Sequence, residues 1–375
     1  MRMKILSIGC GYIGSVLVRH LSERFTSAEI TVSDMDKNSI EKAASFIERN
    51  DVCFLQLNFY DHDKLVEIAK DFDIMVGLTP GRLGYETLKA AIEARVDMVD
   101  LSYMAEDPLT LNEDALKAGI TIVPDCGVAP GLSNLLVGRA ASILDSVKDV
   151  VILVGGLPQE AVPPLDYKVT WCIEDLIEEY VRKAKIVKCG KTVEVEALEG
   201  LEEVEFPGLG KLEAFYTDGV RSLHHTIRAV NMWEKTMRYP GHAEKIRMLR
   251  NLGFFDEKPI DGIVPRLITS KLFERKLVHP DVKDLVAMKV FVSGLRGGTE
   301  TSHTYFLLDR YDEKRRITAM GRTTAYMASA VIELIAGCLV EEKGIITPEK
   351  LGMNDRTYRE IISRLEREGI SIQEA

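Results

Sequence analysis

The segment Lys4–Gly14, KILSIGCGYIG, decides how the N-terminal part of the chain folds. A short apolar run ends at Ile8 and is followed by glycines in the spacing Gly-x-Gly-x-x-Gly, and a helical pattern then begins. In this context the first glycine permits a tight turn, the second lets a pyrophosphate approach the backbone, and the third lets the helix pack close to the strand. The helix N-terminus favours negative charge. The segment therefore predicts a dinucleotide-binding turn formed by Gly9, Gly11, Tyr12, Ile13 and Gly14.

Asp34 supplies the second element of such a site. It lies twenty residues after Gly14, at the end of the apolar run ITVSD. An acidic side chain there accepts hydrogen bonds from the adenosine ribose hydroxyls and repels a 2′-phosphate. No arginine directly follows Asp34, so the sequence predicts NAD rather than NADP as cofactor. A simpler interpretation is that Asp34 only caps the next helix.

Apolar runs and helical patterns alternate from residue 4 to about residue 125. The runs are predicted to be strands at 4–9, 29–33, 52–57, 73–78, 96–101 and 120–124. Strands separated by helices favour right-handed crossovers and a parallel sheet that is covered on both faces. The prediction is an α/β protein whose residues 1–127 form a Rossmann domain with a doubly wound parallel sheet.

Residues after the fourth and fifth strands should border the cofactor. Thr79 and Pro80 follow the fourth strand, and Ser102 follows the fifth. Ligands of doubly wound sheets bind beyond the carboxyl ends of the strands, so these three residues are predicted to contact the dinucleotide. The alternative is that they are ordinary turn residues.

The sequence changes character after Pro130. Strand candidates become longer and alternate between apolar and polar residues, as at 150–154, 167–171, 192–197 and 211–216. The runs 286–293 and 303–308 flank the glycine-rich stretch 294–298, which predicts a hairpin. Residues 128–320 are therefore predicted to form a second α+β domain with a mixed or antiparallel sheet. The helical segment 321–375 follows, and its return to the first domain is left open.

Composition excludes several classes of function. The chain has 375 residues and a formal net charge of −10, whereas nucleic-acid binding usually needs a basic face. No run approaches the roughly 20 apolar residues of a membrane span. The six cysteines are scattered and show no metal-site spacing, so we expect reduced thiols, a cytoplasmic protein and no metal.

The segment 125–134, DCGVAPGLSN, leaves the sixth predicted strand and begins a helix. Its Pro and Gly fix a sharp turn. The carboxylate of Asp125 could meet a cationic substrate or could serve only to form the turn. Cys126 has no evident histidine partner and is not expected to be a nucleophile.

Longer segments show a specific resemblance. They are DCGVAPGLSNLLVGR (125–139), VTWCIEDLIEEYVRKAKIV (169–187), EAFYTDGVRSL (213–223), RYPGHAEKIRMLRNLGFF (238–255) and GRTTAY (321–326). With the glycine motif, these segments make nearly the whole chain resemble the lysine 6-dehydrogenases of the saccharopine dehydrogenase-like group. The chain departs from that group at Arg182-Lys183-Ala184, where Arg-Pro-Ala is common.

The resemblance implies a reaction and an assembly. Its members oxidise L-lysine at the ε-carbon with NAD, giving allysine, ammonia and NADH, and the aldehyde cyclises to piperideine-6-carboxylate. They usually form homodimers or larger homo-oligomers. The expected partner of this chain is thus a small amino-acid substrate, lysine first of all, with no nucleic acid and no membrane.

Such a reaction needs a base and a carboxylate clamp. Hydride leaves only from a neutral amine, so a general base must take up a proton, and arginine suits an α-carboxylate. His242, after a Pro-Gly turn, is the candidate base, with a helix cap or a structural histidine as the alternative. Arg221 and Arg238 are candidate clamps, although either could form an ordinary ion pair. Asp218 is a candidate for holding the amine.

Two other functions stay open at this point. A saccharopine-type reductase would keep the fold but condense an amino acid with a keto acid. A non-catalytic sensor would bind the dinucleotide without turning over any amine.

Overall fold

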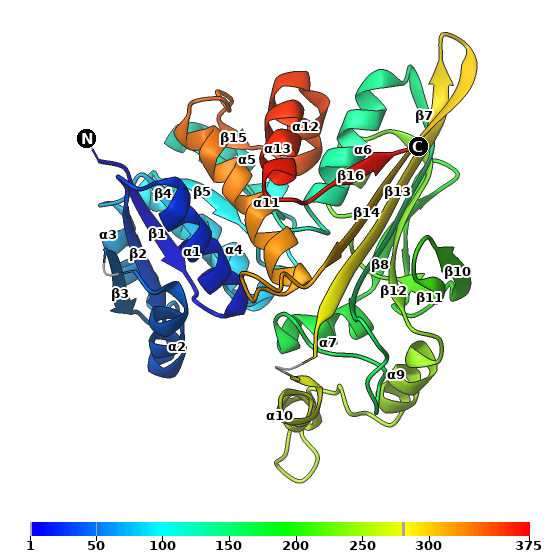
Figure 1. The fold of residues 1–375 in the computed structure, drawn as a ribbon, viewed down its shortest axis with the longest axis horizontal. Helices are drawn as coiled ribbons and strands as arrows, with labels where there is room; N and C mark the ends of the chain where they lie inside the picture. Colours follow the sequence, from blue (N-terminus) through cyan, green and yellow to red (C-terminus); the bar gives the residue numbers. More distant parts are fainter. Residues whose placement is uncertain (1, 50, 280–281) are drawn as a thin grey trace. The chain divides into compact units, whose positions relative to one another are not determined.

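The computed structural model describes residues 2–49, 51–279 and 282–375 and divides into two compact units (Figure 1). The first unit contains the chain up to Arg139 together with Gly321–Gly369. The second unit contains Ala140–Met320 and Ile370–Ala375. The chain therefore enters the second unit, returns to the first, and ends in the second. None of the helices in the described ranges is long and apolar enough to cross a membrane.

The first unit is built on a seven-stranded parallel sheet. Its strand order is β15-β6-β5-β4-β1-β2-β3, which contains the 3-2-1-4-5-6 order of a doubly wound nucleotide-binding sheet. The strands are β1 (Lys4–Ile8), β2 (Glu29–Asp34), β3 (Val52–Gln56), β4 (Ile74–Gly77), β5 (Asp97–Asp100), β6 (Thr121–Val123) and β15 (Gly344–Ile345). The predicted Rossmann sheet is confirmed, and β15 adds a strand that the sequence did not predict.

Helices of this unit lie between the strands and in the returning C-terminal segment. They are α1 (Tyr12–Arg24), α2 (Lys37–Ile47), α3 (His62–Ala69), α4 (Gly81–Ala94), the 3-10 turn η1 (Pro108–Leu111), α5 (Asn112–Ala118), α6 (Leu132–Ile143), α11 (Ala319–Ala336), α12 (Pro348–Met353) and α13 (Asp355–Arg367). β4, in the middle of the sheet, is buried along its whole length, because helices cover both faces of a parallel sheet. Leu6, Met75, Met98 and Ile122 are each fully buried in this core.

Close backbone packing explains where the first unit ends. A Cβ on Gly352 of α12 would lie 1.9 Å from the carbonyl oxygen of Leu135 in α6. A Cβ on Gly138 of α6 would lie 2.1 Å from the carbonyl oxygen of Glu349. The first half of α6 is therefore fixed to α12. The first compact unit therefore extends through Arg139, and the domain boundary predicted after residue 127 stays a prediction.

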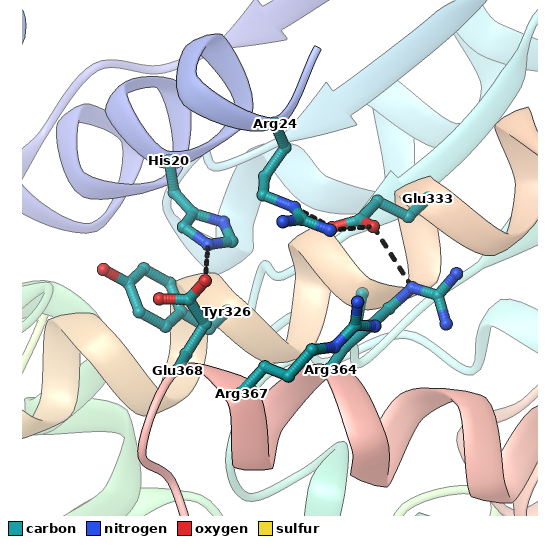
Figure 2. Close-up of a pocket in the computed structure, with 8 residues that line it drawn as sticks. His20, Arg24, Tyr326, Glu333, Arg364, Arg367 and Glu368 are labelled. Atoms are coloured by element: carbon teal, nitrogen blue, oxygen red, sulfur yellow. Dashed lines mark hydrogen bonds and ion pairs between the residues drawn. The ribbon is translucent and has the colours of Figure 1, made fainter.

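A polar cluster ties α1 to the returning segment (Figure 2). His20 of α1 stacks on Tyr326 of α11 with ring centroids 4.0 Å apart. Its Nδ1 lies 2.9 Å from the hydroxyl of Ser329, and its Nε2 lies 3.4 Å from a carboxylate oxygen of Glu368. Glu333 of α11 accepts two hydrogen bonds of 3.2 Å from Arg24. Because these contacts bridge distant parts of the sequence, α11 and Glu368, the residue after α13, hold α1 in place.

The second unit is a nine-stranded mixed sheet. Its main path runs β10-β11-β12-β7-β13-β14-β16, and β8 joins β12 to β9. Among the strand pairs that the described residues form in this sheet, only β12–β7 is parallel. The strands are β7 (Ser146–Pro158), β8 (Ala184–Lys188), β9 (Lys191–Val195), β10 (Glu202–Phe206), β11 (Gly210–Tyr216), β12 (Ala229–Arg238), β13 (Asp284–Arg296), β14 (Thr299–Arg310) and β16 (Ile372–Glu374). The predicted mixed second domain is confirmed.

The helices of the second unit are α7 (Ile173–Val181), α8 (Leu223–Thr226), α9 (His242–Asn251) and α10 (Pro265–Leu277). The predicted hairpin is present as β13 and β14, joined at Gly297 and Gly298, which both have positive φ. The predicted strand at 167–171 is wrong. That segment forms no ladder, because Tyr167 is buried in a cluster with helix residues and Val169 donates its N–H to the carbonyl of Leu277 at the end of α10.

His20 gives the first unit a defined response to acid. Burial lowers the pKa of its imidazole below the ordinary value of 6.5, and the nearby Glu368 only partly offsets that effect. The unfolded chain therefore takes up a proton near pH 6.5 before the folded protein does. The stability contributed by neutral His20 is present above pH 6.5 and is lost as the pH falls toward the lowered pKa. Each unit of pKa lowering corresponds to about 1.4 kcal/mol.

Urea unfolding of the wild type and of His20→Gln between pH 5 and pH 8 tests this. We expect the wild type to lose more free energy of unfolding below pH 6.5 than the variant. Glu368→Gln should extend the loss to lower pH, because it removes the charge that favours the imidazolium. Equal pH dependence in the wild type and His20→Gln would contradict the assignment.

Candidate functional site

The glycines of the turn after β1 have two different roles, close packing within the protein and space for a ligand. Gly9 has a φ of 101°, and a Cβ on it would lie 2.6 Å from the carbonyl oxygen of Leu78. A Cβ on Gly14 would lie 2.6 Å from the carbonyl oxygen of Gly9. A Cβ on Gly11 would meet nothing within 4 Å. The fold itself therefore requires Gly9 and Gly14, whereas Gly11 leaves open space above the turn, as the approach of a pyrophosphate requires.

The N-terminus of α1 begins directly after this turn. Its N-cap residue is Gly11, which has no side chain to cap the helix, and the first turn of the helix holds no acidic residue. The first N–H groups of a helix need partners and carry partial positive charge. Tyr12 begins the helix and is 40% exposed, and Ile13 is partly buried beside it. The residues present fit the phosphates of a dinucleotide.

Asp34 is tied directly to the turn. Its Oδ2 accepts the N–H of Cys10 at 2.9 Å, and its Oδ1 accepts the N–H of Asp36 at 2.9 Å. The helix-cap alternative does not apply, because Asp36 is the N-cap of α2 and accepts the N–H groups of Asn38 and Ser39. Asp34 thus stands at the end of β2 with its position fixed by the glycine turn, and its predicted ribose role stays a prediction.

The neighbouring strand ends differ in what they present. Thr79 is 4% exposed, and its Oγ1 makes no hydrogen bond within the part of the chain that the structure describes. Pro80 is the N-cap residue of α4. The Ser102 hydroxyl instead donates to Asp100 at 2.6 Å, and a Cβ on Gly84 would lie 1.9 Å from it. Thr79 therefore retains hydrogen-bonding capacity for a ligand, whereas Ser102 is used within the protein.

Asp125 follows β6 at the same carboxyl edge of the sheet. It is 3% exposed and has a φ of 53°, in the left-handed region. Among the described non-glycine residues with positive φ, only Asp125 and Arg221 are both buried and polar. Such strained positions cluster at functional sites. The adjacent Cys126 is fully buried, and burial raises the pKa of its thiol, so it is not an activated nucleophile.

A buried polar loop in the second unit holds the other predicted residues. Residues 217–223 join β11 to α8, and all of them are buried, although loops usually lie on the surface. Arg221 has a φ of 52°, and its guanidinium lies 3.4 Å from a carboxylate oxygen of Asp218. Arg182 lies 3.7 Å from the same oxygen. Arg182 is also paired with Glu178 at 3.4 Å, and the structure brings Asp218 and Arg221 together.

His242 has a different environment from the one predicted. It is fully buried at the start of α9, with Nδ1 2.7 Å from the carbonyl oxygen of Leu165 and Nε2 3.0 Å from the hydroxyl of Tyr180. Burial, helped by the nearby charge of Arg238, lowers the pKa of His242 to about 3. Both ring nitrogens are engaged and the ring stays neutral at physiological pH. This is the environment of a structural histidine, the alternative interpretation of the sequence.

Arg238 is also part of the interior. Its guanidinium donates to Glu179 at 2.6 Å and lies over the Tyr167 ring, 4.5 Å from its centroid. Of the two arginines considered as clamps, Arg221 is the one on an irregular, strained loop. The described residues contain no group of three or more His, Cys, Asp or Glu that could hold a metal.

Sequence reasoning missed Glu234. It lies in the middle of β12, is 3% exposed, and accepts a hydrogen bond of 2.5 Å from the hydroxyl of Thr217. Burial is the largest of the effects that raise the pKa of Glu234 to about 8. The available signal was a row of polar residues at alternate positions of the strand, Glu234, Thr236 and Arg238, which places all three on one face.

Comparison with known proteins agrees with this architecture. The family model Saccharopine dehydrogenase NADP binding domain matches residues 5–123, and the model Saccharopine dehydrogenase C-terminal domain matches residues 127–370. The apo saccharopine dehydrogenase (L-Glu forming) of Saccharomyces cerevisiae superposes with a TM-score of 0.79 at 18% identity, covering 100% of this chain and 99% of that one. That similarity supports the α/β fold.

Curated relatives are longer than this chain. The mitochondrial alpha-aminoadipic semialdehyde synthase of Rattus norvegicus is 26% identical over 284 residues, which cover 70% of this chain and 30% of that protein. The saccharopine dehydrogenase [NADP(+), L-glutamate-forming] of Schizosaccharomyces pombe is 25% identical over 273 residues, covering 70% of this chain and 60% of that protein. The chain therefore matches only part of the length of these relatives.

The two roles of the glycines can be separated by mutation. Gly11→Val should weaken NAD binding by about 100-fold or more, because the side chain fills the space that the pyrophosphate needs. Since a Cβ there meets no atom of the protein, the melting temperature should stay within about 2 °C of the wild type. Gly14→Ala should instead destabilise the first unit by about 1–3 kcal/mol.

Calorimetric titration with NAD and thermal unfolding measure both effects. Wild-type affinity in Gly11→Val would show that this turn does not bind the dinucleotide.

Proposed function

The chain belongs to the saccharopine dehydrogenase family, and we propose that within this family it is an NAD-dependent lysine 6-dehydrogenase. The reaction takes L-lysine, NAD⁺ and water to allysine, NADH, ammonium and a proton. The family supports an amino-acid dehydrogenase with a nucleotide-binding Rossmann domain. The choice of lysine rests on the segments that resemble lysine 6-dehydrogenases, among them EAFYTDGVRSL at 213–223.

The observation that carries the proposal is the buried loop that bears Asp218 and Arg221. A buried loop of this kind is costly unless its polar groups are paired, and a left-handed arginine adds strain. Asp218 is shared between Arg221 and Arg182, and Glu178 lies 3.4 Å from Arg182, so these four side chains are balanced in charge and Arg221 faces only a shared carboxylate. Arginine binds carboxylates through two parallel hydrogen bonds, so this cluster suits the α-carboxylate of an amino acid.

The chemistry requires that the lysine ε-amine be neutral before hydride leaves its carbon. Nicotinamide, when bound, accepts the hydride. The protein must bind the amino acid, orient its ε-carbon, accept a proton and admit water to the resulting imine. His242 is unsuited to accept that proton, because it is buried and its pKa is lowered to about 3. Asp125, strained at the carboxyl edge of the sheet, is the predicted residue that stays a candidate.

NAD is proposed as the cofactor because of Asp34. Its carboxylate is fixed beside the glycine turn, and Asp36 adds a second negative charge at the start of α2. A 2′-phosphate at this position would be repelled. The names of the S. pombe relative and of the N-terminal family model specify NADP, so this chain is proposed to differ from them.

A saccharopine-type dehydrogenase is the second candidate function. The similarity to the saccharopine dehydrogenases of S. pombe and S. cerevisiae favours it. The partial coverage of those relatives weighs against a direct transfer of their activity, since the chain aligns with 60% of the S. pombe enzyme. Assembly as a homodimer and a cytoplasmic location stay predictions.

Cofactor choice can be measured as a ratio. The wild type should bind NAD roughly tenfold or more tightly than NADP, and Asp34→Ala should reduce that ratio because the repulsion of the 2′-phosphate is removed. Asp61→Ala, which removes the cap of α3, is the matched control and should leave the ratio unchanged. Tighter binding of NADP than of NAD by the wild type would overturn the NAD assignment.

Turnover of lysine tests the reaction. At saturating L-lysine, NADH and ammonia should form from L-lysine and NAD without any 2-oxo acid, at a rate that rises between pH 7 and pH 10 as the amine and base lose protons. Arg221→Lys should raise KM about tenfold or more with a smaller change in kcat, because lysine keeps the charge but loses the planar fork. The exposed Arg228→Lys is the control.

Three results discriminate between the candidate functions. If NAD binds but lysine gives no NADH, lysine is not the substrate. Activity with saccharopine and none with lysine would establish the second candidate. Binding of NAD without turnover of any amine would favour the sensor.

A further inference from the structure

Glu234 lies directly beneath the buried loop that carries Arg221. Thr217 at the start of the loop donates its hydroxyl to Glu234 Oε2 at 2.5 Å and lies 2.8 Å from the hydroxyl of Thr236. The N–H of Gly219 donates to the carbonyl oxygen of Thr217 at 3.0 Å, and it also faces the carboxyl of Glu234. A Cβ on Gly219 would lie 2.6 Å from the carboxyl carbon of Glu234, so glycine is the residue that lets the loop rest on this side chain. One carboxyl group therefore holds both ends of the Thr217–Gly219 turn.

The charges around Glu234 are already arranged in pairs. Asp218 is paired with Arg221 and Arg182, and Glu179 of α7 is paired with Arg238. Both carboxylates act on Glu234 as like charges. On β7, the residue in register with Glu234 is the apolar Ile152, which offers no counter-charge. A third buried carboxylate at this position would have no cation of its own.

These surroundings determine the protonation state of Glu234. Burial, opposed by the hydrogen bond from Thr217 and increased by the charges of Glu179 and Asp218, raises the pKa of this carboxyl to about 8. Glu234 is therefore mainly neutral at pH 7 and becomes ionised above pH 8. Ionisation places an additional negative charge close to the Asp218–Arg221 pair.

We propose that Glu234 is a positioning residue. With its carboxyl group neutral, Glu234 holds the loop Thr217–Ser222 so that Arg221 can receive the α-carboxylate of the amino-acid substrate. The inference rests on the proposed function, because it takes Arg221 as the carboxylate clamp. Ionised Glu234 lowers the positive potential at Arg221 and so weakens the binding of an anionic group. The clamp thus has an upper pH limit that is set by a residue which does not touch the substrate.

The test measures binding rather than turnover. L-Norleucine has the α-carboxylate and α-amine of lysine but no ε-amine, so it binds without being oxidised there. Its affinity for the holoenzyme with NAD is measured by calorimetry from pH 7 to pH 9.5. Titration of the ligand's own α-amine affects every variant equally, so the comparison between variants isolates Glu234.

Glu234→Gln is the central variant, because glutamine mimics the neutral acid and still accepts a hydrogen bond from Thr217. It should bind L-norleucine like the wild type at pH 7 and about tenfold more tightly than the wild type at pH 9.5. Glu203→Gln, which removes the exposed partner of Lys211 on the same sheet, is the matched control and should follow the wild type at every pH. Thr217→Val should raise KM for lysine at pH 7 with little change in kcat.

The outcomes are distinguishable. The proposal is supported if the affinity for L-norleucine falls at alkaline pH in the wild type and in Glu203→Gln but not in Glu234→Gln. The same pH dependence in the wild type and Glu234→Gln overturns it while leaving Arg221 as the clamp. If neither L-norleucine nor L-lysine binds to the wild-type holoenzyme, the proposed function fails and this inference fails with it.

Discussion

The rest of the first unit depends on the close backbone approach between Gly9 and Gly14. It brings the start of α1 against the end of β1, where any Cβ at Gly14 would collide with the carbonyl of Gly9. This approach directs the uncapped end of α1 toward the edge of the sheet. It also places the N–H of Cys10 within reach of Asp34, which joins the turn after β1 to the end of β2. One contact that only glycine permits thus fixes the direction of α1 and the position of the Asp34 side chain at the edge of the sheet.

Local sequence patterns predicted most of the fold of the first unit but few of the candidate site residues in the second. The glycine motif, the six strands and the hairpin could be predicted because each depends on residues close together in the sequence. β15 could not, because two residues form it and its partner β6 lies more than two hundred positions earlier. The segment 167–171 has a strand-like composition, but its neighbours in space are helices.

The candidate site shows the same limit. His242 was selected for its residue type and its Pro-Gly turn, whereas its environment is set by Leu165 and Tyr180, which lie far away in the sequence. Glu234 was not selected, because no strand was predicted over residues 229–238, where β12 lies. Only the register of β12 with its neighbours shows that this side chain faces inward. Burial and partner identity decide protonation, and both are tertiary properties.

The split of the first unit between the two ends of the sequence has a consequence for synthesis. The outer edge of β6 pairs with Gly344 and Ile345, which leave the ribosome long after Thr121 and Ile122. At roughly 5–20 residues per second, that edge waits about 10–45 s for its partner. An open, apolar strand edge is a template for pairing with other chains. The nascent protein must therefore keep this edge protected through most of its translation, and the returning C-terminal segment is what finally closes it.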